Sequence, residues 1–404
     1  MLPWGYKRAF LCCALLFLLG TVIQLIWGAI PSHMLHYPWS VIAALVYTYA
    51  LVLVYSLSER FPRLKRLYDP YASVAAIVSV TVLSIVFGLV PQTSEGAGAL
   101  AALGWTDMRS SWAFNFLLLY MMTGMGISAI SGLYHLKSGR FVPTLSHLAV
   151  FLVLAGAFFG SGDKVEVLVT AEREQPLAVG ENEAGEAVEL PFMLVLNDFV
   201  IDEYPARLQL SPLEGGMPSK GFLLADAAGN KGLVGDWTLE VLEAYDMAAT
   251  LPEAPGYREM KHVGACPAVR VRATRDTLVR EGWVSCGSFL FDGATLDLGD
   301  GQVVKMPRRM PKRYLSDVTL RSGKGEKRVD ITVNHPAHLG PWMIYQSGYD
   351  MSRGRWSNTS ELLCVKDGWY PLIAVGLWML LGAGVLMFLT AGGRRQTKKE
   401  EDLQ

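Results

Sequence analysis

The chain has 404 residues, of which 51% are hydrophobic and 18% are charged, and its formal net charge is −1. The mean hydropathy is positive. This balance excludes an ordinary cytosolic enzyme, and the absence of a basic patch interleaved with aromatic residues argues against nucleic acid as a partner.

Six windows of about twenty residues are nearly free of charge, and each is long enough to cross a hydrocarbon core of roughly 30 Å as a helix. The windows are residues 9–30, 39–57, 72–91, 111–130, 142–160 and 369–391. The sequence therefore predicts a polytopic α-helical membrane protein. The first window follows two basic residues, as in a secretory signal, but its length and the lack of a small-x-small cleavage site favour a retained helix.

The basic residues beside these windows predict the orientation. On one side lie Lys7, Arg8, Arg60, Arg63, Lys65, Arg66, Lys137, Arg140, Arg394, Arg395, Lys398 and Lys399. In the short loops on the other side, Arg109 is the only basic residue. The positive-inside rule then predicts a multi-pass protein of the cell membrane with both termini in the cytoplasm and residues 161–368 outside. A bacterial inner membrane is the favoured location.

Residues 161–368 have the pattern of a mainly β domain. The opening piece, AEREQPLAVGENEAGEAVEL (171–190), lacks a sustained apolar period and is predicted to be loop or irregular surface. The runs that follow alternate apolar and polar residues between Gly, Pro, Asp and Asn turns. They are FMLVLNDFVIDEY, RLQLS, WTLEVLEAY, AVRVRAT, VVKM, YLSDVTL and RVDITVN. A sandwich or an open barrel is expected.

The five cysteines suggest no thiol-exchange chemistry of the chain's own, because no CxxC motif is present. Cys12 and Cys13 lie in the first predicted helix, where small apolar packing is expected. Cys266, Cys286 and Cys364 lie in the predicted external domain, where oxidation is permitted. Cys266 and Cys286 are candidates for a disulfide, and the free and bonded forms both remain open.

Several short sequence motifs occur in an order that points to a known family. After the third window come GLVPQ, then LGWTDMRSSWAFNFLLLYMM and SHLAVFLVLAGAFFG; the β domain contains LPFMLVLNDFVIDEYP, PKRYLSDVTL and ITVNHPAHLGPWMIYQSGYD. This order resembles the ResB family, membrane proteins of the cytochrome c maturation pathway called System II, over residues 72–391. The matching motif residues, expected to be structural, are Gln92, Trp112, Phe114, Asn334, Pro336, Gly340, Tyr345 and Gln346.

The resemblance implies four parts. Residues 1–70 form an extra pair of helices, 71–160 a three-helix core, 161–368 the β domain, and 369–404 a last helix with a basic tail. The chain lacks the tryptophan-rich W-G-x-W-W type of segment, so the resemblance implies a separate tryptophan-rich membrane partner of the ResC/CcsA type. It further implies apocytochrome c as the client and a thioredoxin-like protein as the source of reduced thiols.

The segment ITVNHPAHLGPWMIYQSGYD closes the β domain just before the last predicted helix. Pro336 and Gly340 are expected to set turns, and Trp342 and Tyr345 suit the boundary between the domain and the membrane. A strand and turn that dock the domain are favoured over direct contact with a ligand.

His147 is the main candidate for chemistry. It lies about five residues into the fifth predicted helix, or roughly 8 Å from the predicted cytoplasmic boundary at 1.5 Å per residue. An ionisable residue inside a membrane helix is a functional candidate, and imidazole can ligate heme iron. The alternative is an interhelical hydrogen bond. The family pattern favours heme b, held transiently, with its second axial ligand supplied by the partner.

The other histidines carry weaker signals. His135 is expected in a solvated loop, His33 and His36 lie between prolines without a third ligand nearby, His335 and His338 suit a turn, and His262 is uninformative. No other metal site is expected. The basic segment KMPRRMPKRY, residues 305–314, could meet heme propionates, lipid head groups or an acidic partner, but a solvated face is favoured.

These observations predict a subunit of a System II complex that helps heme cross the membrane and presents it for attachment to apocytochrome c. No catalytic residue is assigned, and whether the chain has catalytic activity of its own is left open. Two alternatives remain. One is a non-heme membrane scaffold that binds an envelope protein through its β domain, and the other is a heme-containing membrane electron carrier.

Overall fold

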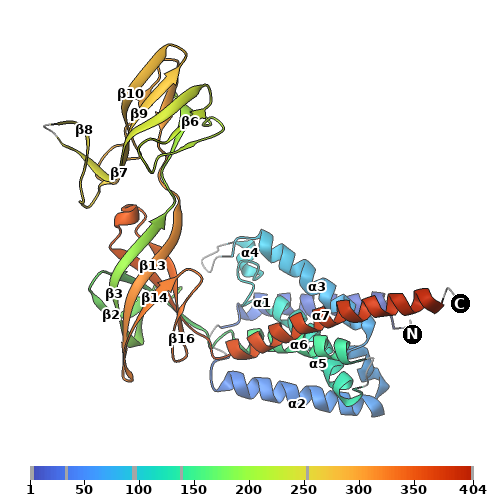
Figure 1. Cartoon of the computed structure of the whole chain (residues 1–404). Coiled ribbons are helices and arrows are strands. Elements are labelled where there is room, and N and C mark those ends of the chain that lie inside the picture. Colours follow the sequence, from blue (N-terminus) through green and yellow to red (C-terminus); the bar gives the residue numbers. More distant parts are fainter. Residues whose placement is uncertain (1–3, 32–34, 93–97, 137–139, 252–253, 402–404) are drawn as a thin grey trace. The chain divides into compact units, whose positions relative to one another are not determined.

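The computed structural model describes residues 4–31, 35–92, 98–136, 140–251 and 254–401 (Figure 1). The chain forms two compact units: a helical unit of residues 1–164 and 367–404, and a β domain of residues 165–366. The β domain begins and ends a few residues inside the predicted range 161–368. The parts expected at 1–70, 71–160 and 369–404 lie together in the one helical unit.

Among the described residues, six helices are long and apolar enough to cross a membrane. They are α1 (Tyr6–Trp27), α2 (Trp39–Arg60), α3 (Pro70–Leu89), α5 (Trp112–Tyr134), α6 (Phe141–Gly160) and α7 (Tyr370–Glu401), and shorter pieces are η1 (Pro62–Leu67) and α4 (Ala99–Ala102). The predicted class, a polytopic helical membrane protein with a large and mainly β domain, is confirmed.

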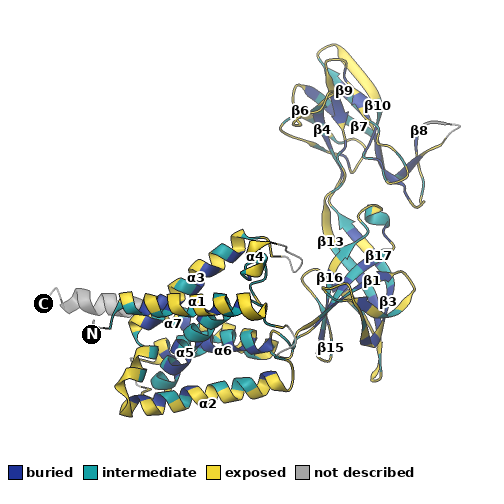
Figure 2. Ribbon diagram, turned by 180° about the vertical axis from the view of Figure 1, so that it is seen from behind, coloured by how far each residue is buried: buried dark blue, intermediate teal, exposed yellow. Residues whose placement is uncertain are grey.

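Small residues let these helices approach closely. A Cβ on Gly20 of α1 would lie 2.5 Å from the Ala113 backbone of α5, and one on Gly156 of α6 would lie 2.7 Å from Ile373 of α7. Glycines of this kind are typical of membrane helix interfaces. The first helix therefore packs into the same bundle as the predicted core, while the outer faces of the helices are widely exposed (Figure 2).

Asp163 fixes the end of α6 to two other helices. Its carboxylate accepts hydrogen bonds from the Tyr37 backbone N–H at 2.5 Å and the Ser40 hydroxyl at 2.6 Å, both at the start of α2. It also accepts one from the Trp369 indole N–H at 2.6 Å, just before α7. Hydrogen bonds to a charged group are stronger than neutral ones, so Asp163 clamps three helix ends together.

The β domain contains three sheets. The first has the strand order β14-β13-β3-β2-β1-β17-β16-β15, the second β10-β9-β7-β6 with β8 paired to β7, and the third β11-β12-β4-β5. The strands are β1 (Val165–Glu172), β2 (Pro176–Glu181), β3 (Ala187–Glu203), β4 (Arg207–Pro212), β5 (Leu223–Leu224), β6 (Lys231–Val234), β7 (Trp237–Leu251), β8 (Ala254–Glu259), β9 (Cys266–Arg275), β10 (Leu278–Ser285), β11 (Leu296–Asp297), β12 (Gln302–Lys305), β13 (Pro311–Ser322), β14 (Gly325–Thr332), β15 (Ala337–Leu339), β16 (Trp342–Tyr349) and β17 (Thr359–Lys366).

The described residues of the β domain form two large hydrophobic cores and one smaller cluster around Tyr257 and Cys266. One is built by the first sheet, with Leu194, Leu320 and Ile344 fully buried. The other lies between the second and third sheets, around Trp237. The first sheet curves back on itself, because β14 at one edge contacts β15 and β16 at the other. It therefore resembles an open barrel more than a flat sheet.

The prediction that residues 171–190 are irregular was wrong. They include β2 and the start of β3, which pair around a turn in which the Asn182 side chain accepts hydrogen bonds from the backbone N–H groups of Ala184 and Glu186. The sequence signal was weak because the exposed side of this hairpin is rich in glutamate, while its ladder hydrogen bonds and a few inward side chains maintain the strands.

We predict that Asp163→Ala destabilises the helical unit by about 2 kcal/mol or more, since three hydrogen bonds to a carboxylate are lost. Amide hydrogen exchange of the detergent-solubilised chain should show faster exchange at the starts of α2 and α7. Ser161→Ala is the matched control, because its hydroxyl donates only to Phe158 of its own helix. Equal effects of the two variants would contradict the clamp.

Candidate functional site

His147 lies on α6 and is half-buried. It shares one side of the helix with Thr144 and Phe151, three and four residues away, which lie against Gly132 and Gly126 of α5. The His147 ring is therefore at the edge of a close helix contact.

The hydrogen bond of His147 defines its tautomer. Its Nδ1 lies 2.7 Å from the carbonyl oxygen of Pro143. A carbonyl can only accept, so Nδ1 carries the proton and the neutral ring keeps a lone pair on Nε2. Histidine ligands commonly have this arrangement, with one nitrogen donating to a carbonyl and the other facing the metal. His147 thus fits the role of one axial heme ligand.

The remaining histidines do not add a second ligand beside His147. His135 caps α5 and is exposed, with its Nδ1 bonded to the Ser131 carbonyl at 3.1 Å. His335 and His338 are exposed on the β domain, and His33 lies outside the described residues. Among those residues no group of three or more His, Cys, Asp or Glu side chains could hold a metal ion.

Three of the motif residues organise the loop between α3 and α5. The Gln92 amide donates to the carbonyls of Phe87, Val90 and Trp105 and accepts from the Met108 N–H at 2.9 Å. The Trp112 indole donates to the Gly28 carbonyl at 3.0 Å, and Phe114 packs edge-to-face on Phe87. All three side chains make contacts that maintain the fold.

The closing segment forms two tight turns. The backbone N–H of His335 donates to the Thr332 carbonyl at 3.0 Å, so Val333 and Asn334 form the first turn, and Pro336 follows it. Leu339 pairs with Trp342, so Gly340 and Pro341 form the second. Gly340 has φ +59°, a conformation that favours glycine. The segment is a short antiparallel meander.

Gln346 joins a buried polar cluster with Ser316 and Ser360. The Ser316 and Ser360 hydroxyls donate to Gln346 Oε1, and the two hydroxyls lie 2.8 Å apart. The Gln346 amide N–H donates to the Gly348 carbonyl at 2.7 Å, where β16 is bulged. The YLS and YQS motifs, about thirty residues apart, therefore meet inside the first core.

The expectation that Trp342 lies at a membrane boundary was wrong. Its side chain is 7% exposed and packs edge-to-face on Phe192 within the first core. Trp342 lies on the side of β16 that faces the core, whereas its nearness in sequence to the last helix had suggested a ring that faces the membrane. Tyr345, on the other side of β16, is half-buried and its hydroxyl lies 3.4 Å from Met343 Sδ.

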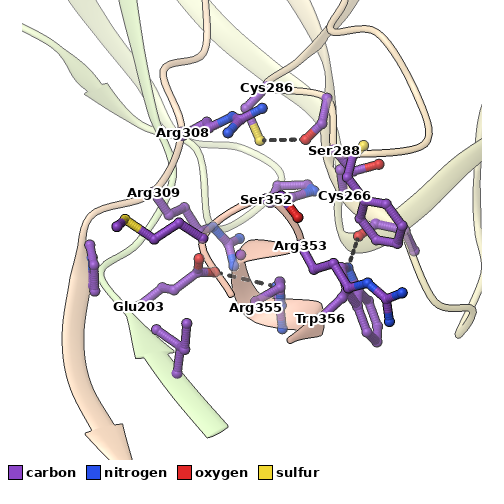
Figure 3. A pocket seen from close by; sticks show the side chains of 18 of the residues that line it. Glu203, Cys266, Cys286, Ser288, Arg308, Arg309, Ser352, Arg353, Arg355 and Trp356 are labelled. Atoms are coloured by element: carbon purple, nitrogen blue, oxygen red, sulfur yellow. Dashed lines mark hydrogen bonds and ion pairs between the residues drawn. The ribbon is translucent and has the colours of Figure 1, made fainter. Parts of the chain in front are cut away.

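The basic segment 305–314 is not uniformly a solvated face. The Arg309 side chain is only 12% exposed and donates to Asp246 at 2.5 Å. Arg355 lies 3.5 Å from Glu203 and 3.7 Å from Asp246. Figure 3 shows Arg309 and Arg355 converging on Glu203 from separate segments. These four residues, called here the charge cluster, were missed because they are scattered along the chain.

The charge cluster shifts the pKa values of its carboxyl groups in opposite directions. Burial raises the pKa of Glu203 above its usual value, although Arg355 and Arg309 oppose this change. Burial also opposes the ionisation of Asp246, but the hydrogen bond and charge of Arg309 outweigh it, so the pKa of Asp246 is lowered. The structure thus keeps a desolvated carboxyl beside two guanidinium groups.

Cys266 and Cys286 are free thiols in the structure, so the disulfide considered from the sequence is not formed in it. Both line one pocket near the charge cluster. The Cys266 thiol lies 3.2 Å from the Ser285 hydroxyl, and burial, followed by the proximity of Cys266, raises the pKa of Cys286 to about 11. Cys286 is therefore a poor nucleophile near neutral pH.

We predict that Cys286 is alkylated slowly at pH 7 to 8 and that the rate rises about tenfold per pH unit up to pH 10, since only the thiolate reacts. Peptide-level mass spectrometry after iodoacetamide treatment measures this rate. An ordinary cysteine would level off near pH 8.5, and such a plateau would contradict the buried thiol. A Cys266–Cys286 crosslinked peptide in the unreduced protein would show instead that the two thiols pair.

Comparison with known proteins supports one family. Residues 253–366 match the ResB-like family, and the match ends at the last residue of β17. The resemblance inferred from the sequence is thus confirmed through the second part of the β domain. No curated protein matches the chain.

Proposed function

We propose, from the ResB-like segment at residues 253–366 and the association of that family with cytochrome c biogenesis, that this membrane protein is a subunit of a System II cytochrome c maturation complex. In this role it helps heme cross the membrane and presents it for attachment to apocytochrome c. The proposal includes cytoplasmic termini, a β domain on the outer side and a tryptophan-rich membrane partner of the ResC/CcsA type.

His147 is the residue of this chain that suits heme. The Pro143 carbonyl holds the ring by its Nδ1–H, which directs the Nε2 lone pair away from the helix backbone. Heme bound there would supply the iron for axial ligation and the vinyl groups that cysteine thiols attack. The carbonyl orients the imidazole without adding a negative charge inside the membrane, where an unpaired carboxylate would be costly.

The geometry favours a shared site over an electron carrier. A carrier within one chain needs two axial ligands on facing helices. The six long helices contain one histidine, His147, since His135 lies just past the end of α5. A second ligand would thus come from the partner, as the proposed complex requires. The thiols of apocytochrome c would be kept reduced by a thioredoxin-like protein.

We expect His147→Ala to lower the heme content of the complex purified with its tryptophan-rich partner by at least about tenfold, the lower range for disturbing a metal site. The Soret and α/β absorption bands measure this content. His147→Gly with added imidazole should restore the bands, because free imidazole can replace the lost ligand.

His135→Ala is the matched control, because His135 is the histidine nearest to His147 in the sequence and is exposed at a helix end. It should leave the spectrum unchanged. A wild-type complex that is colourless, or a spectrum that His147→Ala leaves unchanged, would contradict the heme role and favour the non-heme scaffold. If added imidazole does not restore the bands although the variant is folded, His147 is assigned to helix packing.

A further inference from the structure

A cavity of about 180 Å³ lies within the β domain beside the charge cluster (Figure 3). Its wall is formed by the end of β3, the segment before β13, the loops that carry Cys266 and Cys286, and the short helix η3 (Gly354–Trp356). The Trp356 indole N–H donates to the Ala265 carbonyl at 3.0 Å and closes one side. Nothing in the proposed heme role uses this cavity.

The cavity wall carries an excess of positive charge. Four arginines line it, Arg308, Arg309, Arg353 and Arg355, against one lining carboxylate, Glu203. Two carboxylates outside the wall offset two of these charges. Asp246 pairs with Arg309 and Arg355, and Asp350 pairs with Arg353. Four positive and three negative groups leave an excess of one, and no ion pair of Arg308 is described. The cavity therefore attracts a monoanion.

Two buried guanidinium N–H groups have no hydrogen-bond acceptor among the described residues. They are Nε of Arg309 and one terminal nitrogen of Arg355. The latter nitrogen lies 3.5 Å from Glu203, an ion-pair distance without a hydrogen bond. A buried donor without an acceptor is costly. These two nitrogens are themselves shielded from the cavity, but part of each side chain is exposed, 12% for Arg309 and 27% for Arg355. A carboxylate suits guanidinium groups, because it offers two acceptor oxygens and the matching charge.

The rest of the wall is apolar and limits the size of the ligand. Ile201, Phe289, Met351 and the Trp356 ring lie around the arginines. The volume is below the roughly 300–1,000 Å³ typical of sites for drug-sized ligands. A small carboxylate with one short apolar or aromatic group fits both the chemistry and the size, whereas a dianion such as phosphate would meet repulsion from Glu203.

We propose that this pocket binds the carboxylate of a monoanionic ligand that carries one short apolar or aromatic group, with the guanidinium groups of Arg308, Arg309 and Arg355 that line it as the donors. The carboxylate belongs either to a free small acid or to the C-terminal residue of a peptide. The site is independent of His147 and of heme.

The test uses calorimetric titration of the detergent-solubilised full chain with matched probes. 3-Phenylpropionate is compared with 3-phenylpropionamide, and a tripeptide ending in phenylalanine is compared with its C-terminal amide. An acid that binds is expected to bind at least about tenfold more tightly than its amide, a difference of about 1.4 kcal/mol. Binding of the free acid identifies a small-molecule site, and binding of the peptide acid alone identifies a peptide C-terminus.

Variants locate the binding. Arg308→Gln and Arg309→Lys should each weaken it several-fold. The first change removes a charge, and the second keeps the charge but loses the planar set of guanidinium donors. Arg313→Gln is the matched control, since Arg313 lies on the same chain segment but pairs with Asp202 outside the cavity. Bound acid should also slow the alkylation of Cys286, which lines the wall. Amide hydrogen exchange confirms that each variant is folded.

Three results would overturn the proposal. Equal binding of the acids and their amides would assign the pocket to apolar contacts alone. An effect of Arg313→Gln as large as that of Arg308→Gln would indicate general surface charge. If neither acid binds or protects Cys286, the charge cluster has a structural role only.

Discussion

The chain enters and leaves its β domain through one antiparallel strand pair, and the rest of the architecture depends on this pairing. Val165, the first residue of β1, is paired with Lys366, the last residue of β17. Within the helical unit, Asp163 and Trp369 are joined by a hydrogen bond at 2.6 Å, and α6 packs along α7. About two hundred residues of the β domain thus separate α6 from α7 in the sequence, yet these two helices pack against each other.

Two glutamines of the sequence motifs, Gln92 and Gln346, serve mainly to satisfy hydrogen bonds in this architecture. Gln92 bonds four backbone groups of one loop, and Gln346 joins two buried serines from different strands. Buried polar groups are costly unless every partner is present. These side chains therefore have a structural role without marking a ligand site.

The helices could be predicted from the sequence because a membrane span is a single local property, namely about twenty apolar residues without charge. The strands were predictable where apolar and polar residues alternate, as in β3, β7 and β13. The β2 hairpin was not, because its exposed glutamates hide the few inward residues. Trp342 was misplaced for a related reason: nearness in sequence to a helix does not say which side of a strand faces the core.

The two candidate sites differ in what the sequence could tell. His147 stands out because an ionisable residue within an apolar window is rare, and the structure adds only its tautomer and its setting. The charge cluster could not be foreseen, since Glu203, Asp246, Arg309 and Arg355 come from four segments that each look ordinary. Their convergence depends on how these four segments pack in the folded domain, a tertiary property that no local pattern contains.

The strength of His147 as a ligand follows from its hydrogen-bond partner. A carboxylate bonded to Nδ1 raises the basicity of an imidazole ligand, and such pairs bind metals firmly. A neutral carbonyl fixes the same ring orientation with a weaker electronic effect, and the Pro143 carbonyl lies within reach of Nδ1 because it is four residues earlier on the same helix. Under the proposed function the chain must release heme after presenting it. A single histidine, oriented by a carbonyl and completed by a ligand from another subunit, meets that requirement better than two strong ligands on one chain.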